Sequence, residues 1–198
     1  MVKIVALVEG HGEVAALPIL LRRIAAIVDP SARIEVSRPI RVKRQLLLKP
    51  GELERAVELA ARQAGPDGRI LILLDADQDC PRDLGPALLT RARQIRPDRT
   101  LRVVVAKSEY EAWFVTAVES IAGARGIAAT ATAPKDPESI SDPKRWLSER
   151  MPAARSYRET LDQPALTQLF DLTAARRAPS FDKLWRDVVS LLVPPVPL

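Results

Sequence analysis

Acidic side chains follow three apolar, strand-like runs of this 198-residue chain. They are Glu9 after residues 2–8, Asp75, Asp77 and Asp79 after residues 69–74, and Glu109 and Glu111 after residues 101–106. Parallel strands bring their carboxyl ends to one edge of a sheet, where ligands bind. If these runs are neighbouring strands, the carboxylates converge there. Their mutual repulsion then raises their pKa values unless a cation neutralises them.

The chemistry that such a cluster supports depends on the cation. Carboxylate oxygens are hard ligands that suit Mg²⁺ or Mn²⁺, and these ions keep positions open for water and phosphate oxygens. The expected reaction is therefore phosphoryl transfer or phosphodiester cleavage. An Asp-x-Asp pair is also common in surface turns, so its place after the most apolar run is what favours a metal site. An EF-hand loop is excluded, because Cys80 and Pro86 stand where that loop needs Gly and Glu.

Basic residues gather in a different part of the chain. Residues 36–51, called the basic segment below, contain no acid and carry Arg38, Arg41, Lys43, Arg44 and Lys49. The segment is a candidate contact for nucleic acid, and a solvated surface explains it equally well. The net charge of +5, from 30 basic and 25 acidic residues, decides little by itself. A divalent ion bound to the acids would raise the effective charge and favour a polyanionic substrate.

The turn after the first strand permits a competing interpretation. Residues 10–15 (GHGEVA) fit the G-x-G-x-x-A fingerprint of a dinucleotide site, and Glu35 lies twenty residues beyond Ala15. Against this, Glu9 and Glu13 place negative charge where a pyrophosphate would bind, and no Walker A lysine follows. A dinucleotide site is therefore the weaker prediction for this turn.

Apolar periodicity predicts strands that alternate with helices. The strands are predicted at residues 2–8, 33–42, 69–74 and 101–106, and the helices at residues 13–28, 51–64 and 81–93. Ser108 and Glu111 have the spacing of a capping box for one more helix. Alternation of this kind implies right-handed crossovers and an α/β fold. We expect a mainly parallel sheet of about four strands covered by helices.

The second part of the chain has a different character. Residues 123–142 are small, polar and interrupted by proline, which predicts a loop. Residues 143–192 are predicted as helices broken around Pro152, Pro164 and Pro179, with a frayed PPVPL tail. We therefore expect a core at residues 1–122. Residues 123–198 would be a loop and helical C-terminal extension packed on that core, because they make a thin core alone.

Several classes of protein are excluded by composition. No run approaches the ~20 apolar residues of a membrane-spanning helix. The first eight residues are too short an apolar run for a secretory signal. Cys80 is the single cysteine and His11 the single histidine, which excludes a disulfide framework and a multi-histidine metal site. The cytoplasm is the expected compartment.

Longer motifs carry a family resemblance. A Glu-Gly after the first strand and an Asp-x-Asp after a later one resemble the Toprim fold of topoisomerases, primases and overcoming-lysogenization-defect (OLD) nucleases. VEGHGEVAALPILLRRI, LLDADQDCP, KSEYEAWF and YRETLDQPALTQLFDL…APSFDKLW are similar to the Toprim-like DUF4276 family, in its order and over nearly the whole chain.

The resemblance implies roles for individual residues. Glu9 matches a metal ligand or general acid/base, Asp75 and Asp77 match the Asp-x-Asp metal ligands, and Glu13 matches a second acidic position. Glu111 matches an acid that serves a second metal ion, with Glu109 as its neighbour. From position alone, Asp79 joins the candidate ligands and Lys107 is a candidate phosphate contact.

We therefore expect a Mg²⁺- or Mn²⁺-dependent nuclease or phosphodiester-processing subunit that acts on nucleic acid, with DNA favoured over RNA. Glu9, Glu13 and Lys107 are its predicted catalytic residues. Similar proteins suggest a role in prokaryotic defence beside an ATPase partner, and a homo-oligomer is possible. The alternative is a non-catalytic regulatory or binding subunit of an ATPase complex.

Overall fold

The protein is built on a parallel sheet, described by a computed structural model that covers residues 1–193. The sheet has five strands in the order β2-β1-β4-β5, and β3 also pairs with β1. Every pair is parallel. The strands are β1 (Val2–Val8), β2 (Ile34–Val36), β3 (Ile40–Arg41), β4 (Arg69–Asp75) and β5 (Leu101–Ala106). The predicted α/β class is confirmed, and the predicted PPVPL tail lies outside the described residues.

The strand predicted at residues 33–42 is divided in two. β2 pairs with the first half of β1 and β3 with its end, so both lie along the same side of β1. Pro39 stands between them and cannot donate a ladder hydrogen bond. This division gives five strands where about four were expected. It also carries the basic segment to the carboxyl end of β1.

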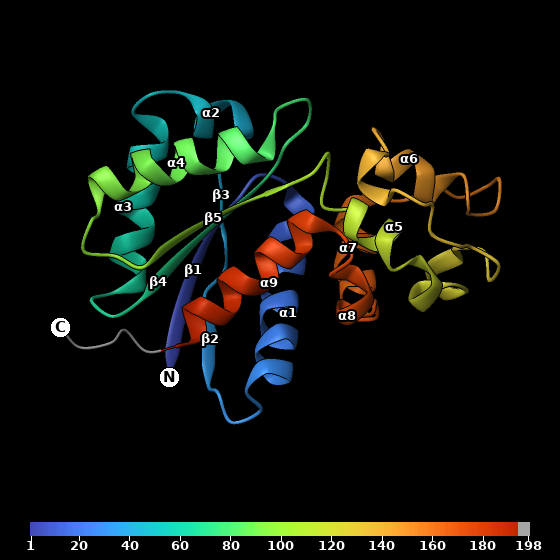
Figure 1. Ribbon diagram of the computed structural model, residues 1–198, viewed down its shortest axis with the longest axis horizontal. Coiled ribbons are helices and arrows are strands. Elements are labelled where there is room, and N and C mark those ends of the chain that lie inside the picture. Colours follow the sequence, from blue (N-terminus) through green and yellow to red (C-terminus); the bar gives the residue numbers. More distant parts are fainter. Residues whose placement is uncertain (194–198) are drawn as a thin grey trace.

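Helices cover both faces of the sheet (Figure 1). Alternate residues of β1 enter two different apolar clusters, as expected for a strand buried on both sides. α1 (His11–Val28) and α9 (Pro179–Leu192) pack on one face, and α3 (Glu52–Ala64) and α4 (Pro81–Ile95) on the other. The short helix α2 (Arg44–Leu48) lies inside the basic segment and was not predicted. Within residues 1–193, no helix is long and apolar enough to cross a membrane.

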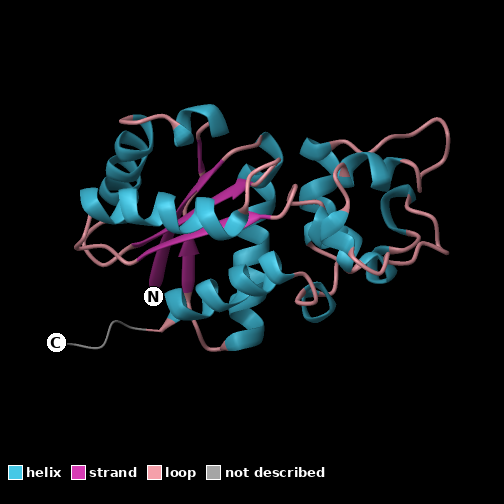
Figure 2. Cartoon of the chain, turned by 45° about the horizontal axis from the view of Figure 1, so that its top comes forward, coloured by secondary structure: helices cyan, strands magenta, loops and turns pink. Residues whose placement is uncertain are grey.

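Short helices of the C-terminal half extend the molecule beside the carboxyl edge of the sheet (Figure 2). They are α5 (Ala112–Thr116), η1 (Val118–Ile121), η2 (Ala124–Gly126), η3 (Pro137–Ser139), α6 (Pro143–Ser148), α7 (Glu159–Thr167) and α8 (Leu172–Ala175). Pro152 lies between α6 and α7, and Pro179 is the first residue of α9, a favoured position for proline. The break predicted around Pro164 is wrong, because α7 continues through it at the loss of one backbone hydrogen bond.

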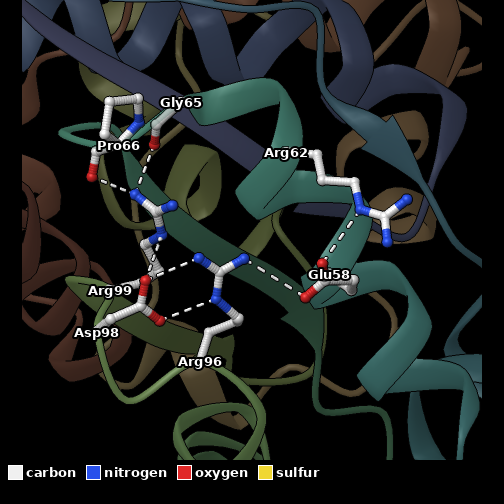
Figure 3. A network of polar contacts seen from close by, with 7 residues as sticks. All are labelled: Glu58, Arg62, Gly65, Pro66, Arg96, Asp98 and Arg99. Carbon is white, nitrogen blue, oxygen red and sulfur yellow. Dashed lines mark hydrogen bonds and ion pairs between the residues drawn. The ribbon is translucent and has the colours of Figure 1, made fainter.

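An ion-pair network closes the opposite, amino edge of the sheet (Figure 3). Arg99 donates to the carbonyl oxygens of Gly65 and Pro66, and so joins the turns that lead into β4 and β5. Asp98 accepts from Arg96, whose Nη2 lies 2.7 Å from Asp98 Oδ2. That hydrogen bond lowers the pKa of Asp98 to about 2. Arginine hydrogen bonds and ion pairs thus join the turns at the amino edge, whereas acidic residues lie at the carboxyl edge.

Aromatic rings join the C-terminal half to the face of the sheet that α1 covers. Tyr110, Trp113, Phe114, Phe170 and Phe181 are fully buried and pack in tilted or edge-to-face pairs, with centroid distances from 4.5 to 5.7 Å. The Trp113 indole N–H donates to Ser180 Oγ at 2.8 Å, which satisfies its one polar atom. These rings come from the turn after β5, α5, the segment between α7 and α8, and α9, so they join segments that are distant in sequence.

This packing predicts that α9 is an integral part of the folding unit. Phe181→Ala should lower the free energy of unfolding by about 3–5 kcal/mol, because it leaves a cavity among the rings. Leu169→Ala is the matched control, because Leu169 is 51% exposed. Urea unfolding followed by circular dichroism measures both. A Phe181→Ala variant as stable as the control would contradict the shared core.

Candidate metal and nucleic-acid site

Five carboxylates converge at the carboxyl edge of the sheet. Glu9 follows β1, Asp75 ends β4 opposite Ala106 of β5, Glu13 lies in the first turn of α1, and Glu109 and Glu111 lie in the turn after β5. The set, called the carboxylate cluster below, consists of Glu9, Glu13, Asp75, Glu109 and Glu111. Their charges act on one another: Glu13, Glu111 and Glu9 each raise the pKa of Asp75. Neighbouring parallel strands thus place the acids where the sequence predicted them.

Hydrogen bonds past the ends of β4 and β5 fix Asp75. Its Oδ1 accepts from the Tyr110 backbone N–H at 2.9 Å. Two residues beyond the last strand pair, the Asp77 N–H donates to the Ser108 carbonyl at 3.1 Å, and both residues have positive φ, 49° and 59°. Left-handed residues of this kind are uncommon and gather at functional sites. Asp75 is therefore held both by its strand and by the turn after β5.

The capping box predicted at Ser108 is wrong. Helix α5 begins at Ala112, with Glu111 before it, and no side chain caps its first turn. Ser108 lies too far upstream, and its backbone is engaged with Asp77 instead. The turn is thus shaped to join β4 and β5 rather than to start a helix. As a result, the Glu111 side chain is free to enter the carboxylate cluster.

Glu111 is fully buried, and its two oxygens face different partners. Oε1 accepts from the Tyr157 hydroxyl at 2.8 Å and from the Gln163 side-chain amide at 3.1 Å. Oε2 lies 3.1 Å from Lys144 Nζ. Both donors to Oε1 come from α7 or the segment before it, so the C-terminal half completes the site.

Lys144 is the cation that the structure places among these acids. Its Nζ lies 2.9 Å from Glu109 Oε1 as well as 3.1 Å from Glu111 Oε2. Its backbone N–H donates to Glu109 Oε2 at 3.3 Å. Burial would lower the pKa of Lys144, but the charges of Glu111, Asp75 and Glu109 overcome this and raise it. Lys144 therefore stays charged at any physiological pH.

Two carboxylates accept hydrogen bonds from backbone N–H groups at the start of α1. Glu13 Oε2 accepts from the Gly10 N–H at 2.6 Å, and Glu159 Oε1 accepts from the Gly12 N–H at 2.9 Å. A Cβ on Gly12 would meet Gln163 Oε1 at 2.2 Å, so glycine is needed there for close packing with α7. In a dinucleotide site these N–H groups would bind pyrophosphate. Here both N–H groups already donate to carboxylates, which argues against a dinucleotide site at this turn.

Burial and crowding make the cluster favourable for a cation. Burial first, and then the charges of other carboxylates, raise the pKa of Glu9 and raise that of Asp75 well above its usual range. The same causes raise the pKa of Glu13 to about 7. Burial also raises the pKa of Glu111, and Lys144 opposes this. A bound divalent cation would reverse these shifts, because it stabilises the ionised carboxylates.

Two carboxylate oxygens of the cluster, Glu9 Oε2 and Glu111 Oε2, are buried without a hydrogen bond within the described residues, and Lys144 forms an ion pair with the second of them. In that same part of the chain, no three His, Cys, Asp or Glu side chains are arranged as a ready metal site. Mg²⁺ does not need one, since it commonly uses one or two carboxylates and keeps several waters. The donor set at Glu9 and Asp75 therefore fits Mg²⁺ or Mn²⁺ in chemistry and charge.

Asp77 and Asp79 are turned toward the basic segment. Arg44 Nε lies 3.3 Å from Asp77 Oδ2, and Arg44 Nη2 pairs with Asp79. Arg44 also donates to the carbonyls of Asp75 and Ala76, at 3.2 and 3.1 Å. Asp77 remains close enough for its charge to raise the pKa of Glu9, after the larger effect of burial. Arg44 therefore fixes the loop after β4, and Asp79 is not brought into the cluster.

The other bases of the basic segment face solvent beside the cluster. β3 pairs with the end of β1, with Arg41 opposite Val8, and Arg41 Nη1 lies 3.5 Å from the Glu9 carbonyl oxygen. The exposed residues are Arg38, Arg41, Lys43 and Lys49. Acids and bases that are separated in sequence thus share one edge of the sheet.

Three further residues that the sequence singled out lie elsewhere. Lys107 is half-buried after β5, where its charge opposes the rise that burial causes in the pKa of Glu138. His11 is exposed at the first position of α1, and Cys80 is exposed just before α4. None of the three has a contact with the cluster within the described residues.

Sequence reasoning missed Lys144, Tyr157, Glu159 and Gln163. The last three lie in the YRETLDQ motif that carried the family resemblance, so the motif could have pointed to them. Lys144 gave a weaker signal. It stands in the first turn of α6, after the cap Asp142, where the helix dipole disfavours a cation unless acids are near.

The protein is therefore a parallel α/β protein whose sheet has acidic residues at its carboxyl edge. The chain matches the family described as Domain of unknown function (DUF4276) over residues 8–188, and it belongs to that family. Neither a search of curated proteins nor a search of solved structures returned a match.

Glu13 offers a test of the electrostatics. Its pKa rises from the ordinary value of 4.5 to about 7, so the folded protein keeps this proton at a pH where the unfolded chain loses it. The stability from this group is present below about pH 4.5 and is lost as the pH rises through about 7. Glu13→Gln should therefore flatten the fall in stability over this range and stabilise the protein at about pH 8 by roughly 1–3 kcal/mol.

Urea unfolding in metal-free buffer at about pH 5 and about pH 8 measures this effect. Glu149→Gln is the control, because Glu149 is exposed just after α6 and pairs with Arg145. If the slope of the free energy of unfolding against pH were the same in wild type and in Glu13→Gln, burial and neighbouring charges would not raise the pKa of Glu13.

Proposed function

We propose that this chain is a Mg²⁺- or Mn²⁺-dependent nuclease or related phosphodiester-processing subunit. The observation that carries the proposal is the carboxylate cluster, with its unpartnered Glu9 oxygen, beside the exposed bases of the basic segment. An edge that presents both an ion site and phosphate-binding cations suits a polyanionic substrate. The Toprim-like resemblance supports the same chemistry and is itself part of the proposal.

Each residue has a part that follows from its position. Glu9 and Asp75 would hold the ion, which when bound supplies an activated water and charge stabilisation at phosphorus. The Tyr110 N–H donates to Asp75 Oδ1 and so orients this carboxylate, and Oδ2 would be the oxygen that it offers to an ion. Glu13, with a pKa of about 7, would exchange a proton near neutral pH, as a general acid or base requires. Arg41 and Lys43 would bind the phosphate backbone.

The wider setting of the activity is also proposed. The family resemblance suggests a prokaryotic defence system with an ATPase partner, and DNA is the favoured substrate. A cytoplasmic site of action is proposed from the cysteine content. The single, free Cys80 fits a reducing compartment.

One observation favours a second candidate function. Lys144 already neutralises part of the cluster, and within the described residues no three ligands form a ready metal site. A non-catalytic subunit that binds nucleic acid or a partner, with a cluster stabilised by lysine alone, would have these features. Cleavage and metal binding distinguish the two candidates.

The nuclease proposal predicts the effect of Asp75→Asn. The asparagine keeps the acceptor for Tyr110 N–H and removes the charge that an ion needs. Cleavage of DNA with Mn²⁺ should fall by more than the roughly 10- to 100-fold that loss of an outer-shell partner causes. Asp67→Asn, at an exposed position before β4, should cleave as wild type does.

A gel assay of labelled single- and double-stranded DNA, with and without any ATPase that the same operon encodes, measures the rates. If wild type neither cleaves DNA or RNA nor binds Mn²⁺ under any of these conditions, the nuclease proposal fails. The non-catalytic function then replaces it.

The nucleic-acid interface predicts a charge effect on binding. The double variant Arg41→Gln, Lys43→Gln should weaken DNA binding and lower the slope of log K against log salt by about 1 per residue. Arg55→Gln, Arg62→Gln is the matched control on α3, where both arginines are exposed and pair with glutamates. Fluorescence anisotropy over a salt series measures DNA binding by each double variant. All the proteins also carry Asp75→Asn, which prevents cleavage of the DNA during the titration. Equal slopes for both double variants would remove the basic segment from the interface.

A further inference from the structure

The carboxylate cluster has two sides, which differ in how their oxygens are used. On one side, Glu9 Oε2 has no hydrogen-bond partner, and Asp75 accepts through Oδ1. On the other side, Glu109 uses Oε1 for Lys144 Nζ and Oε2 for the Lys144 backbone N–H. Glu111 gives Oε1 to Tyr157 and Gln163, and Oε2 to Lys144. Glu111 Oε2 accepts no hydrogen bond within the described residues, but it forms an ion pair with Lys144. The oxygens of the second side therefore all have a hydrogen-bond donor or the lysine charge as a partner.

Lys144 is anchored so that its ammonium cannot easily leave. Asp142 accepts from the Arg145 N–H at 2.8 Å and caps the first turn of α6. The Ser148 hydroxyl donates to the Lys144 carbonyl at 2.8 Å. With the Glu109 contact to its backbone, Lys144 is fixed at both main-chain polar atoms. Its side chain is only 30% exposed.

From these contacts we propose that Lys144 is the second cation of this site, and that the cluster takes a single divalent ion, on the side of Glu9 and Asp75. The inference rests on the proposed metal-dependent function and makes it more specific. A second ion at Glu109 and Glu111 would have to displace a charged lysine from two carboxylates. Lys144 Nζ forms ion pairs with both carboxylates, at 2.9 and 3.1 Å. An ammonium has three N–H donors, so it would also offer one to a phosphate oxygen of the substrate.

Metal stoichiometry tests this inference without an activity assay. Calorimetric titration with Mn²⁺ at about pH 8 should give one ion per wild-type chain. Lys144→Met removes the charge but keeps the length of the side chain, and it should gain a second ion. Lys144→Arg keeps the charge and should bind one. Lys183→Met is the matched control, because Lys183 also pairs with a carboxylate, Asp187, but on α9.

Thermal stability gives a second readout on the same proteins. Without metal, Lys144→Met should melt below wild type, because it leaves the buried Glu111 without its counter-ion. Mn²⁺ should raise its melting temperature by more than it raises that of wild type or Lys183→Met.

Electron paramagnetic resonance of wild type saturated with Mn²⁺ needs no variant, and so holds even if Lys144→Met does not fold. The spectrum should be that of an isolated ion. A spin-coupled pair, or two ions per wild-type chain, would overturn the lysine inference and leave the metal-dependent function standing. No Mn²⁺ binding at all would overturn both. One ion in Lys144→Met, with unchanged melting, would also overturn the inference.

Discussion

Repulsion between buried carboxylates is the constraint on which the rest of this structure depends. Parallel pairing of β1, β4 and β5 brings Glu9, Asp75 and Glu111 to one edge. Burial there raises the pKa of each of them. Such an edge is stable only if cations and hydrogen-bond donors oppose the repulsion. Lys144, Tyr157 and the backbone of the turn after β5 supply that opposition.

The C-terminal half is therefore part of the site. α6 contributes Lys144, and α7 contributes Gln163 to Glu111 and Glu159 to the start of α1. Phe170, just after α7, packs against Phe114 of α5 and Phe181 of α9, so the buried aromatic rings hold the end of α7 in the core. Because Glu159 of α7 also accepts from the Gly12 N–H, one packing arrangement both orients Glu111 and removes an N–H group that a pyrophosphate would use.

Much of the fold could be predicted from the sequence, because apolar periodicity and turn residues are local signals. The strands at residues 69–74 and 101–106, and the acids that follow them, are examples. The partners of those acids could not be predicted in the same way. Lys144 reaches Glu111 only after α6 docks, and Arg44 meets Asp77 only because β3 ends beside β1. Contacts of this kind depend on tertiary packing, as do the positive φ of Ser108 and the uninterrupted helix at Pro164.

The central claim is that Glu9 and Asp75 form an ion site that Lys144 completes from the other side. The most direct measurement is the anomalous diffraction of crystals grown with Mn²⁺. A single anomalous peak bound by Glu9 and Asp75, with the Lys144 ammonium still on Glu109 and Glu111, is the predicted result. A peak that replaces Lys144, or crystals with no peak between Glu9 and Asp75, would contradict the account.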